Sequence, residues 1–188
     1  MSETPDAAVV ARVLAGSRQE FGTLVSRYQD RILAYIRYMG FNEADAHDLA
    51  QDAFVRAFRH LRRCGDPDRF AGWLFRITAN VCRTAGSRRA RREAEPLDAY
   101  RAALATDEPG PHEQAEASWT KERVRAALDA LPDDQREALV LMYLMDYSVA
   151  EIEEVTGASA SAVKMRLKRG RDSLRDQLEA MFVEAHEP

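Results

Sequence analysis

The chain has little of what most enzymes and secreted proteins depend on. Only two of its 188 residues are cysteine, Cys64 and Cys82, which is too few for a disulfide framework or a zinc site with paired ligands. It also has no glycine-rich phosphate loop, no nucleophile elbow and no HExxH sequence. These absences argue against enzymatic chemistry, and we expect neither a cofactor nor a bound metal.

Long apolar runs are missing as well. No run approaches the roughly 18 residues that a membrane-spanning helix needs. The N-terminus is acidic at its start and lacks the basic segment of a secretory signal. With 46% hydrophobic and 31% charged residues and a net charge of −4, the composition is typical of a folded, soluble protein. We therefore expect a cytoplasmic location without membrane insertion.

Helical periodicity accounts for most of what is present, and strand signals are nearly absent. Apolar residues recur at helical spacing over 20–39, 43–61 and 69–84, which predicts three helices, with Gly86 ending the third in a basic tail. Before them, VVARVLAGSRQE looks like a short amphipathic lead-in helix. Removal of residues 1–19 is expected to be harmless.

The composition changes at residues 93–118, where seven acids and three prolines indicate a flexible acidic linker. Four further helices are expected after it, at 119–130, 132–145, 148–156 and 159–182. The second half of the chain is therefore a separate helical block.

The last two predicted helices have the pattern of a helix-turn-helix. Ser148 and Glu151 have capping-box spacing at the start of the shorter helix, and Gly157 suits a tight turn. The longer helix has a basic stripe with helical spacing at Ser161, Lys164, Lys168, Arg171 and Arg175. A separate apolar stripe consists of Val163, Leu167, Gly170, Leu174 and Leu178. The apolar side of this helix therefore suits packing into a core, and the basic side suits binding of an anion.

Two polar faces stand out in the first block. Carboxylates at Asp45, Asp48 and Asp52 lie at i, i+3 and i+7, which fits either a solvated surface or a site for a basic partner. A second face contains Trp73, Arg76, Asn80 and Arg83. It suits single-stranded DNA, because an aromatic ring stacks on bases while arginine and asparagine hold phosphates and base edges. The alternative is a core tryptophan beside solvated arginines.

These segments resemble a known family. LPDDQREALVLMYLMDYSVAEIEEVTGASASAVKMRLKRGRDSLR (131–175) resembles region 4 of bacterial sigma factors, and DAHDLAQDAFVRAFRHL followed by FAGWLFRITANVCRT resembles region 2. The two blocks, the acidic linker and the short length together resemble the extracytoplasmic-function (ECF) group of the sigma-70 family. The resemblance covers roughly 20–92 and 119–182. It implies an all-α protein with a region 2 bundle in 1–92 and a region 4 helix-turn-helix in 119–188.

The same resemblance implies partners and site residues. A coiled coil on the largest catalytic subunit of RNA polymerase core would contact Asp45, Asp48, Leu49, Gln51, Asp52 and Phe54. The minus-ten promoter element would be opened and held by Phe70, Trp73, Arg76, Asn80, Arg83, Arg88 and Arg89. Loop 62–69 would select a flipped base. The minus-thirty-five element would be read by Ser161, Ala162, Lys164, Met165, Arg166, Lys168, Arg169 and Arg171.

Further implied partners are the flap of the second-largest polymerase subunit and an anti-sigma factor. One departure from the family is Gly170, where such factors more often carry alanine; glycine there should cost about 1 kcal/mol. Two other functions stay open: a stand-alone helix-turn-helix regulator that binds duplex DNA without polymerase, and an interaction protein whose helices only bind partners.

Overall fold

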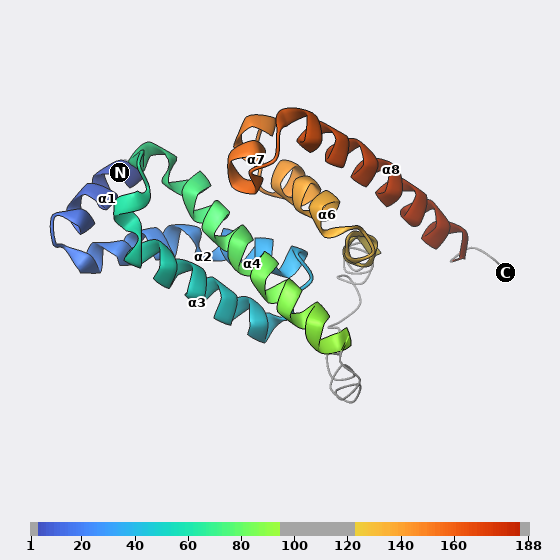
Figure 1. The fold of residues 1–188 in the computed structure, drawn as a ribbon, viewed down its shortest axis with the longest axis horizontal. Coiled ribbons are helices and arrows are strands. Elements are labelled where there is room, and N and C mark those ends of the chain that lie inside the picture. Colours follow the sequence, from blue (N-terminus) through green and yellow to red (C-terminus); the bar gives the residue numbers. More distant parts are fainter. Residues whose placement is uncertain (1–3, 95–122, 185–188) are drawn as a thin grey trace, which may run out of the picture.

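The computed structural model describes residues 4–94 and 123–184, and within these residues it contains helices and no strand (Figure 1). The expected all-α class is confirmed. The predicted linker at 93–118 lies almost entirely outside the described residues.

The first block contains four α-helices and three short 3₁₀ turns: α1 (Asp6–Leu14), η1 (Arg18–Glu20), α2 (Phe21–Tyr38), α3 (Glu43–Arg59), η2 (Leu61–Arg63), η3 (Pro67–Arg69) and α4 (Phe70–Ala94). Asn42 caps α3 by accepting a 2.8 Å hydrogen bond from the Asp45 amide. Pro67 stands at the first position of η3, where its missing amide hydrogen costs nothing. Helices α2, α3 and α4 pack together as a bundle.

Helix α1 belongs to the core, contrary to the expectation that residues 1–19 are dispensable. Val9 and Val10 are fully buried. The Asp6 carboxylate accepts hydrogen bonds from Arg27 and from the hydroxyl of Tyr28, both on α2. Removal of α1 would therefore expose apolar surface and leave these partners without their acceptor.

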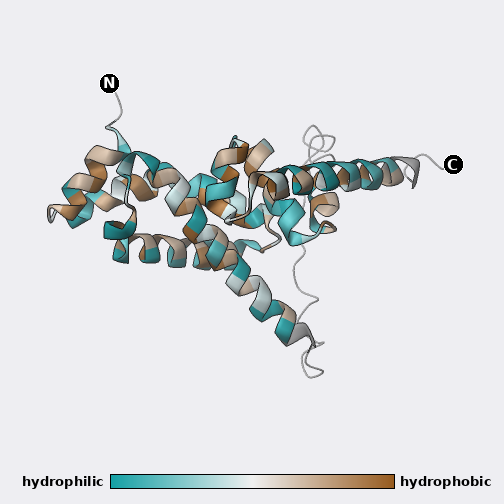
Figure 2. Ribbon diagram, turned by 45° about the horizontal axis from the view of Figure 1, so that its top comes forward, coloured by the Kyte–Doolittle hydropathy of each residue, from teal (hydrophilic) through white to brown (hydrophobic). Residues whose placement is uncertain are grey.

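Gly86 does not end the third predicted helix. Helix α4 continues through it to Ala94, and the far ends of α4 and α8 (Ala160–Glu184) extend from the body as largely hydrophilic arms (Figure 2). The reason is that one glycine costs a helix only about 1 kcal/mol. The alanine and arginine residues around it are strong helix formers.

The second block begins with a helical segment at 123–129 and continues through α6 (Asp133–Leu139), a π-helical turn η4 (Val140–Leu144), α7 (Val149–Thr156) and α8. The predicted capping box is present: Ser148 and Glu151 exchange hydrogen bonds at the start of α7. Gly157 ends α7 with a φ of 73°, a left-handed conformation that favours glycine. Val163 and Leu167 are buried as predicted.

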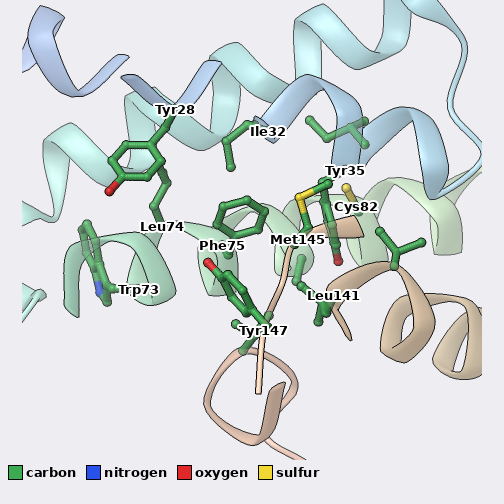
Figure 3. Packing of buried hydrophobic residues seen from close by; sticks show 14 of the residues in the cluster. Tyr28, Ile32, Tyr35, Trp73, Leu74, Phe75, Cys82, Leu141, Met145 and Tyr147 are labelled. Atoms are coloured by element: carbon green, nitrogen blue, oxygen red, sulfur yellow. The ribbon is translucent and has the colours of Figure 1, made fainter. Parts of the chain in front are cut away.

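The two blocks share one hydrophobic core. Helix α7 lies against α4, and the ring of Phe75 in α4 meets Tyr147 edge-on with centroids 5.2 Å apart (Figure 3). Figure 3 also shows Tyr35 of α2 beside Met145 and Leu141 from the second block. In this structure the first and second blocks are therefore packed face to face.

Candidate DNA and polymerase interfaces

Trp73 lies between two cavities on the outer side of α4. Its side chain is 8% exposed, so most of the ring is packed and only an edge faces outward. The first cavity has a volume of about 320 Å³, and its lining residues are Arg56, His60, Arg63, Trp73, Arg76, Ile77 and Asn80. The fold thus brings three of the four residues of the predicted α4 face to one hollow.

The second cavity adjoins the loop that was expected to select a base. Its volume is about 350 Å³, and its lining residues are Cys64, Asp66, Arg69, Gly72, Trp73, Arg76 and Glu154. Asp66 fixes the loop by accepting a 3.0 Å hydrogen bond from the Asp68 amide. Partial burial and the nearby Asp66 raise the pKa of the Cys64 thiol, so this cysteine is not an activated thiolate.

Arg83, the fourth residue of the α4 face, lies apart from the first cavity. It donates a 2.7 Å hydrogen bond to Asn80 and forms an ion pair of 3.4 Å with Glu137 of the second block. Arg89 donates to the carbonyl of Gly40 at 3.2 Å, and Arg88 is exposed. The basic end of α4 therefore offers cations at its surface, but Arg83 is already paired.

Phe70 does not lie on the surface that was predicted to bind DNA. Its side chain is fully buried and packs against the rings of Phe21, Tyr28 and Trp73. Direct contact between Phe70 and DNA does not fit this position; the residue supports Trp73 from behind. The apolar stripe of the helix indicated this burial, because Phe70, Leu74 and Val81 share one side.

Helix α8 presents the predicted basic stripe to solvent. Ser161, Lys164, Lys168, Arg169 and Arg171 are exposed, and Met165 is 49% exposed. Ala162 and Arg166 are half-buried instead. Arg166 forms a 3.0 Å ion pair with Asp134 of α6. It points toward the contact between the blocks rather than along the exposed stripe.

The carboxylates of α3 form the predicted acidic face. Asp45, Asp48 and Gln51 are exposed, and Asp52 pairs with Arg56 at 2.8 Å. Leu49 is half-buried. Phe54 is 8% exposed and belongs to the core, so any contact with a partner is limited to its edge.

Two sets of residues beside these surfaces were missed by the sequence argument. Arg56, His60 and Arg63 line the first cavity together with the residues of α4. Their signal was the i, i+4 spacing of Arg56 and His60 at the C-terminal end of α3. Val55 and Phe58, each 38% exposed, continue the outer face of α3 and line a groove with a volume of about 550 Å³. Phe58 matches the helical spacing of the apolar residues over 43–61, which indicates burial, yet the residue is partly exposed.

The described residues contain no group of three His, Cys, Asp or Glu side chains that could hold a metal ion. In the same residues no helix is both long and apolar enough to pass through a bilayer. Burial raises the pKa of the Cys82 thiol to about 12.

Comparison with known proteins identifies the family. A family model for sigma-70 region 2 matches residues 24–92, and one for sigma-70 region 4 matches residues 121–174. The RNA polymerase sigma factor CnrH of Cupriavidus metallidurans is 36% identical over 95% of this chain and 96% of its own length. The chain belongs to the sigma-70 family of RNA polymerase sigma factors.

Further relatives place this sigma factor in the ECF group. The ECF RNA polymerase sigma factor SigE of Mycolicibacterium smegmatis is 35% identical over 82% of this chain and 60% of its own length. A solved structure of CnrH in complex with the cytosolic domain of CnrY has a TM-score of 0.70 and 31% identity, and covers 94% of this chain and 99% of that one. As a sigma factor the protein acts in transcription initiation with RNA polymerase and promoter DNA, and it is not an enzyme. The two alternative functions are thereby set aside.

Proposed function

We propose that the cavity beside Trp73 holds the single-stranded minus-ten element of the promoter. Arg76 and Asn80 line it from α4, and Arg56, His60 and Arg63 line it from α3 and the segment that follows; the two arginines of the second group add positive charge. A cavity with arginines beside a tryptophan suits an unpaired strand, because the cations meet phosphates. A base can stack on Trp73 only if the ring, which is 8% exposed here, turns a face toward the cavity. Arg83, Arg88 and Arg89 hold the backbone further along α4. The cavity at loop 62–69 takes the flipped base.

Region 4 reads the minus-thirty-five element with α8. Ser161, Lys164 and Met165 lie exposed near the N-terminus of this helix, the end that a helix-turn-helix presents to base edges. Lys168, Arg169 and Arg171 are exposed further along and contact phosphates. Ala162 and Arg166 are half-buried, and Arg166 faces DNA only after it leaves Asp134 of α6. The domain boundaries of this assignment are 1–92 and 119–188, joined by the linker at 93–118.

The outer face of α3 binds the coiled coil of the largest polymerase subunit. Asp45, Asp48 and Asp52 supply carboxylates for a basic partner. Leu49, Gln51 and the edge of Phe54 complete the expected set. The exposed side chains of Val55 and Phe58 extend it with apolar contact area.

Region 4 makes the second polymerase contact, at the flap of the second-largest subunit. An anti-sigma factor that covers these surfaces holds the protein inactive, by analogy with CnrH, which was solved in complex with the cytosolic domain of CnrY. The proposed location is the cytoplasm, where polymerase and promoters are.

Run-off transcription and oligonucleotide binding with the reconstituted polymerase holoenzyme test the Trp73 cavity. Arg76→Ala removes a cation without touching the core, since Arg76 is exposed. We expect about tenfold less run-off transcript and a salt slope for single-stranded binding that is smaller by about 0.7, one phosphate contact.

Arg125→Ala is the matched control, because Arg125 is an exposed arginine of region 4 outside both cavities beside Trp73. It should leave transcript yield and salt slope unchanged. Equal behaviour of the two variants would contradict the assignment of the cavity. Sequence-selective binding by the chain without polymerase would contradict the dependence on core enzyme.

A further inference from the structure

Arg171 differs from the last cation of the basic stripe of α8 in how its side chain is held. Its Nη1 donates a 3.1 Å hydrogen bond to the hydroxyl of Tyr143, and among the described residues no carboxylate forms an ion pair with it. Arg175, four residues further along, forms ion pairs with Asp176 at 3.2 Å and Glu179 at 3.8 Å. Arg171 is therefore fixed by an uncharged group and keeps its positive charge available for an anion.

Tyr143 reaches Arg171 from a different element, the π-helical turn η4. Its side chain is 55% exposed and takes no part in the hydrophobic core, so core packing does not account for its position. In the part of the chain that the structure describes, the bond from Arg171 is the one hydrogen bond that its hydroxyl makes. Short π-helical turns often occur at functional sites, and this one presents a hydroxyl to the basic stripe.

The close approach of α6 and α8 brings the two side chains together. These helices pack against each other (Figure 1), and a Cβ at Gly170 would lie 3.1 Å from Cδ1 of Leu139. Tyr143 comes four residues after Leu139, and Arg171 directly follows Gly170. The contact therefore depends on a position at which the chain departs from the family pattern, glycine in place of alanine.

The hydrogen bond leaves donors available on both partners. A guanidinium has five N–H groups and no acceptor, so the Tyr143 oxygen is the acceptor and its own proton stays free to be donated. Both side chains are exposed. Two neighbouring donors suit a phosphate, which presents several acceptor oxygens, and both arginine and tyrosine bind phosphates in protein–DNA complexes.

We propose that Tyr143 and Arg171 together bind one backbone phosphate of the duplex beside the minus-thirty-five element. Tyr143 holds the guanidinium in place and donates its hydroxyl proton to the same phosphate. The inference rests on the proposed function of α8 and adds to it a residue from outside the helix-turn-helix. DNA is favoured as the partner because the pair continues the line of exposed cations formed by Lys164 and Lys168.

Holding the arginine in advance has a physical benefit. Ordering a long, flexible side chain on binding costs conformational entropy, and a side chain that is already held loses less of it. Because the Tyr143 hydroxyl is uncharged, it orders Arg171 without neutralising it, as a carboxylate would. Tyr143 is therefore expected to raise the affinity for DNA although it carries no charge.

The test compares two duplex fragments bound by the reconstituted polymerase holoenzyme. One is a promoter fragment that this holoenzyme transcribes in run-off reactions, and the other is the same fragment cut between the two elements, so that only the minus-ten part remains. Tyr143→Phe removes one exposed hydroxyl and leaves the core intact. We expect it to bind the whole fragment about threefold to tenfold more weakly and the cut fragment as tightly as the unmodified protein does.

Tyr38→Phe is the matched control. Tyr38 is a half-buried residue at the end of α2, and its hydroxyl makes no hydrogen bond among the described residues. The same chemical change at this position should leave the affinity for both fragments unchanged. Equal losses for Tyr38→Phe and Tyr143→Phe, or a loss on the cut fragment, would contradict the assignment.

A double-mutant cycle tests whether the two side chains act as one site. Arg171→Ala should weaken binding of the whole fragment and make the slope of log affinity against log salt shallower by about 0.9, the value for one phosphate. Tyr143→Phe changes no charge and should alter this slope by less. The combined variant should lose less affinity than the product of the two single losses, because the hydroxyl has no guanidinium left to hold.

The remaining outcomes separate this inference from the proposed function. If Arg171→Ala weakens binding and Tyr143→Phe does not, or if the two losses simply multiply, the joint site is wrong while α8 keeps its proposed role. If Arg171→Ala has no effect, both fail. Weaker association of the Tyr143→Phe chain with core polymerase at unchanged affinity for DNA would instead mark η4 as a protein contact and overturn the phosphate site.

Discussion

Gly170 shows how a single residue can be explained by its neighbours rather than by its helix. A Cβ built at Gly170 would lie 3.1 Å from Cδ1 and 3.2 Å from Cγ of Leu139, so the glycine lets α8 approach α6 closely. We expect Gly170→Ala to lower the free energy of unfolding by about 1 kcal/mol, because overpacking exceeds the gain in helix propensity. Gly86→Ala is the control, since nothing lies within 4 Å of a Cβ there; it should raise stability by about 0.5–1 kcal/mol. Urea unfolding checks both, and a gain for Gly170→Ala would contradict the close-approach explanation.

The sequence predicted exposure better for charged residues than for aromatic ones. Arg76, Asn80 and Lys164 are exposed where helical spacing placed them. Phe54 and Phe70, which the family resemblance added to the binding sets, are core residues. An aromatic ring in a binding motif can serve by supporting its neighbour. The apolar stripe of α4 indicated that role for Phe70, whereas the family resemblance did not distinguish support from contact.

Helix α7 depends on its capping box for a defined start. The Ser148 hydroxyl accepts a hydrogen bond from the Glu151 amide, and the Glu151 carboxylate accepts 2.8 Å and 2.6 Å bonds from the Ser148 amide and hydroxyl. We expect Ser148→Ala to cost about 1 kcal/mol in urea unfolding. Ser26→Ala, in the exposed middle of α2, should instead be neutral or slightly stabilising.

The same capping box makes the cost of Ser148→Ala in unfolding free energy depend on pH. The bonds from Ser148 lower the pKa of Glu151 below its ordinary value of 4.5. The contribution of the capping box is therefore present above pH 4.5 and is lost as the pH falls through the lowered pKa. A cost of Ser148→Ala that stayed constant down to that range would contradict this role of the carboxylate.

At the scale of elements, the helix ends that depend on nearby residues could be predicted from the sequence, whereas those that depend on tertiary packing could not. The capping box and Gly157 mark the ends of α7 because both act within a few residues. Gly86 was misread as a stop, since a helix in favourable sequence continues through one glycine. The π-helical turn η4 has no local signal; it ends at the segment where the buried Tyr147 packs on Phe75 of α4.

The closed arrangement of the whole molecule could not be predicted from the sequence. Phe75 and Cys82 lie off the apolar stripe that α4 turns to its own block. They are nevertheless buried, because region 4 covers them from a second side. Tyr35 and Glu137 are separated by 102 positions and are joined by one hydrogen bond. Helical periodicity predicts which side of a helix packs into the core of its own domain. It does not predict which other element covers a second side, because that depends on tertiary packing.

That arrangement predicts a pH dependence of closure. Burial raises the pKa of the Glu137 carboxyl above its ordinary value of 4.5, against the lowering effect of Arg83. The other ionisable groups facing it are Tyr35, Cys82, Asp133 and Arg166. Because the closed form binds the proton more tightly, its stabilisation is complete below pH 4.5 and is lost as the pH rises through the raised pKa. We therefore expect the radius of gyration of the full chain to decrease as the pH is lowered from 7.5 toward 5.

Glu137→Gln is the decisive comparison for this pH dependence. The glutamine side chain does not titrate, so the change in the radius of gyration that protonation of Glu137 causes must disappear in this variant. The change in radius that comes from the net charge of the other residues stays. A pH profile identical to that of the unmodified chain would assign the change to other carboxylates. A radius that grew on acidification in the unmodified chain alone would mean that the charged form of Glu137, held by Arg83, is the one that closes the molecule.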